Sequence, residues 1–379
     1  MSQYDPNRPY NALPDLPPEV DIETPAILKK CIPARVALAE LKQACHRIPN
    51  QKVLINTIPV REARDSSAIE NIVTTENSLF RHAAAKDAET DMATRETARY
   101  LQALMDGVHG ISERRVSTST AVTVCQIIRA IEVNIRNTPG TALRSSGSDK
   151  IIYTPPEGET ILRDKLRSWE TYLNQDSDVD PLIRMALAHY QFEAIHPFTD
   201  GNGRTGRILN ILYLIDQGLL DIPVLYLSRY LIENRDDYYR LLLDVTARSE
   251  WEAWIIFMLS AVEQTAKHTI AKIFAIKALM DHTTDFISSV NSKIYKHELI
   301  ELIFQNPICR IGYLTEAGLG TRQTVSGYLK GLCEIGVLVE EKFGREKIFL
   351  NIKLMKLLAS DDNNFEPYGP SVTNDPSPN

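Results

Sequence analysis

The sequence has few cysteines, no long apolar run and no excess of positive charge. The five cysteines include no C-x-x-C pair, which argues against a disulfide framework or a structural zinc site and predicts reduced thiols in a cytoplasmic protein. The most apolar stretch, residues 208–215, ends at Asp216 and is far shorter than the ~20 residues of a membrane span. The first residues resemble no signal peptide, so we predict no membrane partner. A net charge of −7 excludes a general attraction to nucleic acid.

The composition is that of an ordinary globular protein, with 44% hydrophobic and 24% charged residues. A length of 379 residues suggests two or three domains at roughly 150 residues each. Seven of the first 33 residues are proline, which predicts an extended segment that is either draped over the body or loose. Residues 359–379 are polar, contain four prolines and lack periodicity, and we predict a disordered tail there.

Between these ends an apolar period near 3.6 residues predicts a mainly α protein. Helices are expected over residues 34–47, 61–72, 93–108, 116–135, 161–174, 181–195, 205–217 and 251–279. The start at residue 181 is the clearest, because Asp180 is a good N-cap and Pro181 suits the first helical position. One exception lies at residues 143–155, where the pattern predicts a short β-hairpin or flap.

Helices at residues 296–304, 315–318 and 321–335, followed by two β-rich arms around Gly344, predict a C-terminal winged helix-turn-helix. We therefore divide the chain into an N-terminal region (1–90), a helical core (91–285), the winged helix (286–358) and the tail (359–379). Basic and acidic residues alternate in the winged helix. DNA contact, protein docking and formation of a homodimer all remain open as its role.

The most informative stretch is His196-Pro-Phe-Thr-Asp-Gly-Asn-Gly-Arg-Thr-Gly-Arg207, between two helical segments. Pro197 forces the chain to turn, while Gly201 and Gly203 leave backbone N–H groups uncovered at the start of the next helix. Such a helix N-terminus favours anions such as phosphates.

The charged side chains of this loop suit a nucleotide. Arg204 and Arg207 are three residues apart, which places them on one helix face where two guanidiniums suit a polyphosphate. Asp200 offers oxygen ligands for Mg²⁺, and His196 can accept a proton from a hydroxyl at neutral pH. Together these residue types describe a phosphoryl or nucleotidyl transfer site.

The twelve residues match the pattern H-P-F-x-[D/E]-G-N-G-R-x-x-R, and the chain thereby resembles the Fic (Fido-fold) family. The resemblance implies transfer of AMP from Mg²⁺–ATP to a Ser, Thr or Tyr hydroxyl of a target protein, self-modification included. It makes His196 the general base and Asp200 the metal ligand. It implies that ATP and its phosphates are bound by Gly201, Asn202, Gly203, Arg204, Thr205, Gly206 and Arg207. Family members that phosphorylate carry lysine at the position of Gly203, which favours nucleotidyl transfer here.

A second match lies upstream, where residues 66–71 fit the inhibitory pattern [S/T]-x-x-x-E-[G/N] of Fic proteins with an N-terminal blocking helix. Ser66 and Glu70 are i and i+4 on one helix side, with Asn71 completing the pattern. The resemblance implies that Glu70 pairs with Arg207 and keeps the γ-phosphate from its productive position.

Two questions stay open at this point. Tyr238 and Tyr239 could stack on adenine or simply pack in the core. Besides an inhibited adenylyltransferase, the sequence allows a transcription regulator that senses a nucleotide without turnover. It also allows an enzyme that removes AMP, with Glu70 orienting the water.

Overall fold

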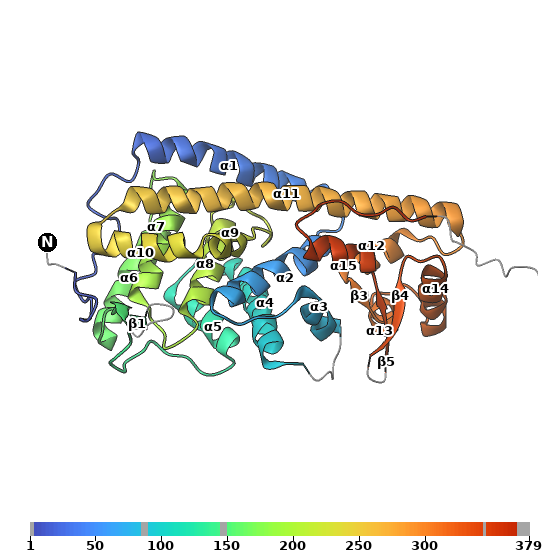
Figure 1. Ribbon diagram of the computed structural model, residues 1–379, viewed down its shortest axis with the longest axis horizontal. Helices are drawn as coiled ribbons and strands as arrows, with labels where there is room; N and C mark the ends of the chain where they lie inside the picture. Colours follow the sequence, from blue (N-terminus) through green and yellow to red (C-terminus); the bar gives the residue numbers. More distant parts are fainter. Residues whose placement is uncertain (1–3, 85–89, 145–149, 344–345, 370–379) are drawn as a thin grey trace, which may run out of the picture.

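The structure is a computed structural model that describes residues 4–84, 90–144, 150–343 and 346–369. The described chain is mainly helical with a short β-hairpin, as predicted (Figure 1). The helices are α1 (Pro25–Cys45), α2 (Lys52–Ile69), α3 (Glu76–Ala84), α4 (Met92–Ile111), α5 (Thr118–Arg129), α6 (Glu159–Asn174), α7 (Pro181–Ile195), α8 (Asn202–Asp216), α9 (Leu227–Glu233), α10 (Arg235–Arg248), α11 (Trp251–Val290), α12 (His297–Gln305), α13 (Ile311–Glu316), α14 (Arg322–Glu334) and α15 (Ile352–Ala359). The strands are β1 (Leu143–Arg144), β2 (Ile151–Tyr153), β3 (Ile308–Cys309), β4 (Val339–Phe343) and β5 (Glu346–Leu350).

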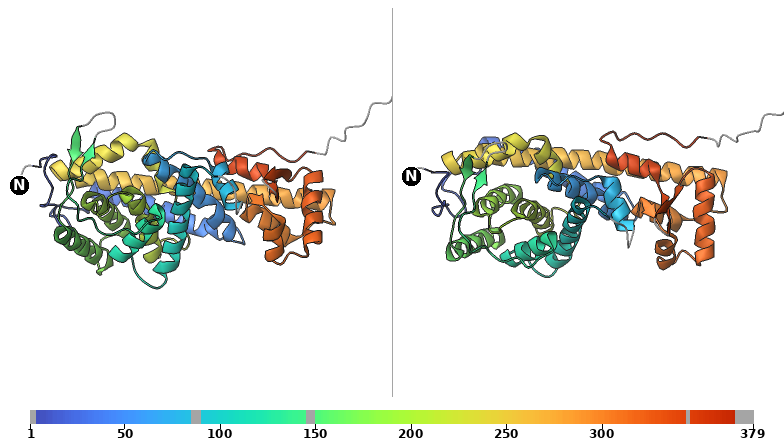
Figure 2. Two further views of the ribbon diagram at one scale, coloured as in Figure 1. Left: turned by 90° about the horizontal axis from the view of Figure 1, so that it is seen from below. Right: turned by 60° about the horizontal axis from the view of Figure 1, so that its bottom comes forward.

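The 40-residue helix α11 runs along most of the molecule, with α1 packed against its N-terminal half (Figure 1). Lys30 of α1 forms an ion pair with Glu263 of α11 at 2.7 Å. The other helices of the core lie on the opposite side of α11, and the C-terminal unit lies at its far end (Figure 2). Among the described residues, no helix is both long enough and apolar enough to cross a membrane.

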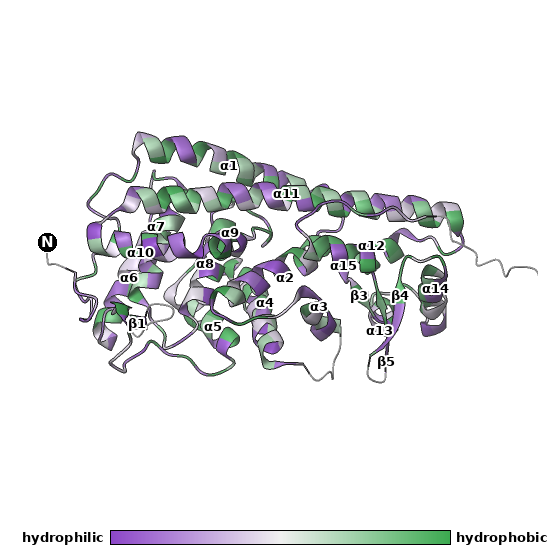
Figure 3. Cartoon of the chain, viewed as in Figure 1, coloured by the Kyte–Doolittle hydropathy of each residue, from purple (hydrophilic) through white to green (hydrophobic). Residues whose placement is uncertain are grey.

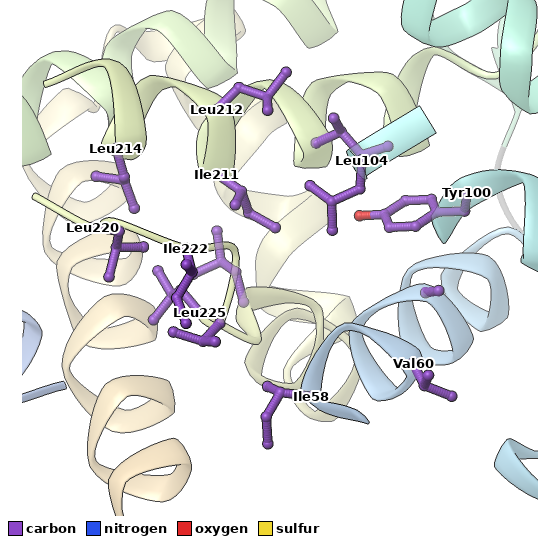
Figure 4. Close-up of a cluster of buried hydrophobic side chains, with 14 of the residues drawn as sticks. Ile58, Val60, Tyr100, Leu104, Ile211, Leu212, Leu214, Leu220, Ile222 and Leu225 are labelled. Carbon is purple, nitrogen blue, oxygen red and sulfur yellow. The ribbon is translucent and has the colours of Figure 1, made fainter. Parts of the chain in front are cut away.

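The core of the helical body lies where α2, α4 and α8 meet the segment between α8 and α9 (Figure 4). Its buried side chains are Ile58, Tyr100, Leu104, Ile211, Leu212, Leu214, Leu220, Ile222 and Leu225. Colouring by hydropathy shows apolar positions recurring along the whole length of α11 (Figure 3). This pattern fits a helix that packs against both α1 and the core.

The N-terminal helices begin earlier than predicted. Helix α1 starts at Pro25, because the Thr24 hydroxyl caps it by accepting from Ile27 N at 3.3 Å and proline suits the first turn. Pro33 lies inside this helix, so the extended segment ends at residue 24. Helix α2 likewise contains Pro59 and spans 52–69, since burial of its apolar side outweighs the backbone hydrogen bond that proline removes.

The proline-rich segment is draped over the body, one of the two predicted alternatives, and it contacts the β1–β2 hairpin. The hydroxyl of Tyr4 donates to Ile152 O at 2.6 Å, and the Tyr10 N–H donates to Thr154 O at 3.0 Å. The rings of Tyr4 and Tyr10 also contact Tyr153. The hairpin pairs Leu143 with Tyr153 in antiparallel register, and the connection at 145–149 lies outside the described residues.

The C-terminal unit departs from the predicted boundaries. Helix α11 continues through the expected domain boundary at 285/286 and ends at Val290. Helix α13 covers 311–316, so the short helix predicted at 315–318 was placed too late. Helices α12 to α14 and then β4 and β5 follow the order of a winged helix, and β3 adds a third strand in the order β3-β5-β4. The predicted wing tip at Gly344 lies outside the described residues.

The prediction of a disordered tail is wrong for the first part of that segment, residues 359–369. Ala359 ends α15, a helix that the sequence pattern did not reveal. The following residues are ordered against α11, where the Tyr368 ring stacks on His282 and Phe286. Asp361 pairs with Arg61 of α2 at 2.7 Å. The polar composition concealed these contacts, because they depend on partners about 80 and 300 residues away. Residues 370–379 lie outside the description.

Candidate active site

His196 is placed by the end of α7. The helix starts at the predicted cap, where the Asp180 carboxylate accepts from Leu182 N at 2.8 Å. It ends at His196, whose φ of 50° is left-handed and therefore unfavourable for a residue with a Cβ. Arg136 stabilises this turn, because its Nε donates to His196 O at 2.8 Å and its backbone N–H donates to Pro197 O at 2.9 Å. The same guanidinium reaches Pro156 O, just after β2.

The surroundings of His196 keep its imidazole neutral. Burial and the positive charge of Arg136 lower the pKa of His196 to about 4. His196 lines a cavity together with Glu70, Gly203 and Arg207. A neutral imidazole at pH 7 has the protonation state that a general base requires.

The loop after His196 is shaped by Asn202. Its Oδ1 accepts from Phe198 N and its Nδ2 donates to Phe198 O, both at 2.8 Å. Gly201 caps α8 with a φ of 86°, a conformation that suits glycine. The side-chain amide of Asn202 thus donates one hydrogen bond and accepts another within the loop, and the binding of phosphate by Asn202 stays a prediction.

Asp200 lies at the exposed mouth of the loop. Its side chain is 55% exposed, its Oδ1 accepts from Gly201 N at 2.6 Å, and its Oδ2 pairs with Arg129 of α5. Among the described residues, no group of three His, Cys, Asp or Glu side chains could hold a metal ion. A divalent cation at Asp200 would therefore need oxygen atoms from a ligand and from water, as Mg²⁺ commonly has.

The two arginines of the motif point to different partners, contrary to the prediction of one shared face. Arg204 is buried and pairs with Glu96 of α4 at 2.7 Å, so it lies away from the cavity. Thr205 is fully buried, and Gly206 packs against Glu193 and Phe192 of α7. Side chains three residues apart differ in direction by about 60° around the helix axis, and the contacts of α8 with α4 and α2 give each arginine a different partner.

Arg207 meets the inhibitory segment at the end of α2. Its Nη2 donates to Glu70 Oε1 at 2.8 Å and to Ser66 O at 2.9 Å, while its Nε donates to Ser66 Oγ at 2.8 Å. Burial alone would raise the pKa of Glu70, but the Arg207 guanidinium and its hydrogen bond hold that pKa below its ordinary value. Glu70 and Arg207 are therefore both charged, and the predicted pair is present in the structure.

The chain turns directly after this carboxylate. Glu70 follows the last residue of α2, and Asn71 is left-handed with a φ of 62°. A Cβ at Gly203 would overlap Glu70 Oε1, so glycine at this position leaves space for the Glu70 carboxylate beside the loop. Asn71 contributes through this turn of the backbone.

The cavity in front of Arg207 is bounded by Glu70, His196, Gly203 and the hairpin residues Leu143, Ile152 and Tyr153. Both candidate tyrosines also line it. Tyr238 is buried and shares a 3.0 Å hydrogen bond with His189 Nε2, whereas Tyr239 is 40% exposed and lies under the Arg235 guanidinium. An aromatic wall opposite a cationic end fits a nucleotide by shape and charge.

Four residues of this site were missed in the sequence. Arg136, Glu96 and Arg129 carry no local signal, because they lie 60 or more residues from their partners in the loop. Glu193 could have been found, since a carboxylate one turn before His196 on the same helix is bound to lie near the site.

Three family models match consecutive parts of the chain. They are described as Fic/DOC family N-terminal (residues 28–109), Fic/DOC family (118–214) and Protein adenylyltransferase SoFic-like, C-terminal domain (279–354). The first of these models extends past the boundary that we predicted at residue 90.

Curated relatives match part of the chain. Protein adenylyltransferase fic-1 of Caenorhabditis elegans is 32% identical over 149 residues, which is 38% of this chain and 26% of that protein. The probable protein adenylyltransferase aq_aa38 of Aquifex aeolicus is 32% identical over 93 residues, 24% of this chain and 29% of that protein. The matches thus span less than a third of each relative.

Among solved structures, a Fic family protein from Desulfovibrio desulfuricans aligns with a TM-score of 0.55 at 17% identity. The alignment covers 86% of this chain and 96% of that one, so the two proteins share a fold over most of their length.

Proposed function

The chain belongs to the Fic/DOC family, and on that premise we propose that it is a protein adenylyltransferase which Glu70 holds in an inhibited state. One observation carries the proposal. The loop 196–207 presents His196, the start of α8 at Gly203 and Arg207 to one cavity, and the carboxylate of Glu70 pairs with Arg207.

The arrangement supports an in-line transfer of AMP. His196 accepts the proton of a target Ser, Thr or Tyr hydroxyl while the oxygen of that hydroxyl forms a bond to the α-phosphorus of ATP. The bond from the α-phosphorus to the bridging oxygen breaks, and pyrophosphate leaves. The backbone amide of Gly203, in the first turn of α8, suits a phosphate oxygen, and Arg207 suits the terminal phosphate.

The exposed carboxylate of Asp200 fits a role in holding Mg²⁺ together with the polyphosphate. When bound, the ion would neutralise phosphate charge. An ion at Asp200 would compete with Arg129, which lies at the end of α5 and whose Nη1 is also 3.9 Å from Glu96 Oε1.

The inhibition follows from competition for one guanidinium. Glu70 and the γ-phosphate are both anions that need Arg207, and removing the carboxylate frees the guanidinium without altering the loop. We expect Glu70→Gly to raise AMP transfer at least tenfold, since ~1.4 kcal/mol of competition gives a factor of ten. Glu70→Asp, one methylene shorter, should release the inhibition only in part.

The test measures transfer of label from α-³²P-ATP to the protein itself and to proteins of a cell lysate. The matched control is Glu70→Gly combined with His196→Ala, which should bind Mg²⁺–ATP and transfer no AMP. A Glu70→Gly rate equal to that of the unaltered protein under saturating Mg²⁺–ATP would contradict the inhibitory role. Labelling that persists in the His196→Ala variant would contradict the assignment of His196 as the general base.

A further inference from the structure

Glu193 is a carboxyl group of the cavity that neither the transfer step nor the Glu70 contact uses. It lies on α7 one turn before His196 and lines the cavity together with Arg207 and Glu70. Its Oε1 is buried and has no hydrogen-bond partner among the described residues. A buried polar atom without a partner is costly, so in a ligand cavity it indicates a group that changes partner or protonation state when the ligand binds.

The position of this carboxyl depends on Gly206. A Cβ at Gly206 would overlap Glu193 Oε1 and lie only 3.2 Å from the Phe192 ring. Only glycine at this position of α8 allows the Glu193 side chain to lie flat between α7 and α8. The carboxyl is thereby held beside the residue that precedes Arg207.

Two carboxyl groups in this cavity face one guanidinium. Glu70 already pairs with Arg207 at 2.8 Å, and Glu193 is left without a counterion of its own. Burial raises the pKa of Glu193 to about 7, with Arg207 opposing the shift and the negative charge of Glu70 adding to it. At neutral pH the group is therefore divided between its neutral and ionised forms.

The other titratable groups around Glu193 keep one charge state near neutrality. Tyr238 and Tyr239 of α10 stay protonated, because burial raises the pKa of both phenols. His189, one turn earlier on α7, is neutral, since burial lowers its pKa to about 3. His196 is neutral as well. Glu193 is thus the group in this part of the cavity that titrates at physiological pH.

We propose that Glu193 is a second carboxyl competitor for Arg207, which must be protonated for a nucleoside polyphosphate to bind. Once Glu70 withdraws, ionised Glu193 takes up the guanidinium, while protonated Glu193 leaves it to the terminal phosphate. Entry of the polyphosphate disfavours the carboxylate further, so each bound nucleotide is accompanied by uptake of a proton on Glu193. This inference rests on the proposed function only in taking a nucleoside polyphosphate as the ligand.

The test counts protons in a protein that cannot turn over. In the Glu70→Gly, His196→Ala background, binding of Mg²⁺–ATP is measured calorimetrically at pH 7.5 in two buffers of different ionisation enthalpy. We expect uptake of a large fraction of one proton and an affinity that falls several-fold from pH 6.5 to pH 8.5. Adding Glu193→Gln should abolish most of the uptake, flatten the pH dependence and strengthen binding at pH 8.5. Protonation of ATP itself is common to both proteins.

The matched control is Glu334→Gln, on the exposed face of α14, which should leave the proton count unchanged. Equal melting temperatures check that the variants are folded. An unchanged proton count in Glu193→Gln, or weaker binding by that variant, would overturn the proposal, and so would failure of Mg²⁺–ATP to bind either protein. Absence of AMP transfer by Glu70→Gly, with the proton uptake still present, would instead contradict the proposed function alone.

Discussion

At the scale of single residues, the catalytic loop is set by charges that lie outside it. Burial lowers the pKa of the His196 imidazole and Arg136 lowers it further, while Arg136 also holds the backbone of His196 and Pro197, so one residue contributes to both the geometry and the protonation state. Glu70 acts on Arg207 in a comparable way, because its carboxylate accepts a hydrogen bond from the guanidinium and offsets its positive charge. The chemistry of the motif thus depends on two residues that the motif does not contain.

The lowered pKa of His196 leads to a prediction about pH. The base works when neutral, and with a pKa of about 4 it stays neutral down to about pH 5. Transfer by Glu70→Gly should therefore show no loss attributable to His196 between pH 7 and pH 5.5. An ordinary histidine, with a pKa of ~6.5, would lose about tenfold over that range. The measurement is the rate of AMP transfer at saturating Mg²⁺–ATP, with circular dichroism confirming that the protein stays folded.

Arg136→Gln provides the companion measurement. The substitution removes the positive charge beside the imidazole, so the pKa of His196 should rise and the acid limb of the pH–rate profile should move to higher pH. The rate at neutral pH should also fall, because the loop loses a contact. A profile of unchanged shape would show that Arg136 acts on the loop geometry alone.

At the scale of elements, the site is a meeting point of α7, α8 and the end of α2. Helix α7 provides His196 and Glu193, α8 provides the amides and Arg207, and α2 brings Ser66 and Glu70. Helix α8 is held on its other side by the Arg204–Glu96 pair to α4, where the guanidinium is 2% exposed. This buried pair positions the start of α8, and with it the anion-binding amides.

Loss of that pair should cost stability. Glu96→Gln would leave Arg204 charged, buried and without a carboxylate, and removing one partner of a buried pair costs ~3–5 kcal/mol. We expect a clear fall in the urea midpoint of unfolding. Glu159→Gln is the control, because its pair with Arg163 is exposed on both sides and such pairs contribute ~0–1 kcal/mol. Equal midpoints for the two variants would show that Arg204 finds another partner or water.

At the scale of the whole molecule, the C-terminal residues hold the inhibitory helix. Arg61 of α2 donates to Ser360 O at 3.3 Å and pairs with Asp361 at 2.7 Å, and Arg229 of α9 pairs with the same carboxylate. Lys272 of α11 donates to Ser360 O at 2.7 Å. The middle of α2 is thus tied to the chain end that follows the C-terminal unit, while the end of α2 carries Glu70.

This connection predicts an effect on activity over a long distance. Asp361→Asn weakens the tie to Arg61 and should let α2 shift, raising AMP transfer by about two- to fivefold, the range expected from an ion pair worth ~0.5–1 kcal/mol. In the Glu70→Gly background the same change should have no effect, because the inhibitory carboxylate is already gone. Equal stimulation in both backgrounds would show that Asp361 acts on something other than the inhibition.

Several charged residues of the C-terminal unit form ion pairs within the protein. Arg310 pairs with Glu346 at 3.0 Å, Lys347 pairs with Glu340, and Arg81 of α3 pairs with Glu341 of β4 at 2.8 Å. Among the described residues, the β4–β5 pair of strands therefore contacts α3 through Glu341. Its role in DNA contact, protein docking or dimer formation stays a prediction.

What the sequence determined by itself is local. The twelve-residue loop, the caps at Asp180 and Pro181 and the mainly helical period were readable, because each depends on residue types within a few positions. The pairing of Glu70 with Arg207, 137 residues apart, was implied only by the resemblance to a family. The tertiary structure decided the rest. It turned Arg204 toward Glu96, placed residues 360–369 on α11, and brought Arg136 to the base. These outcomes depend on burial and on charges contributed by distant elements, and a carboxylate or guanidinium acquires its partner and its pKa only when those elements pack together.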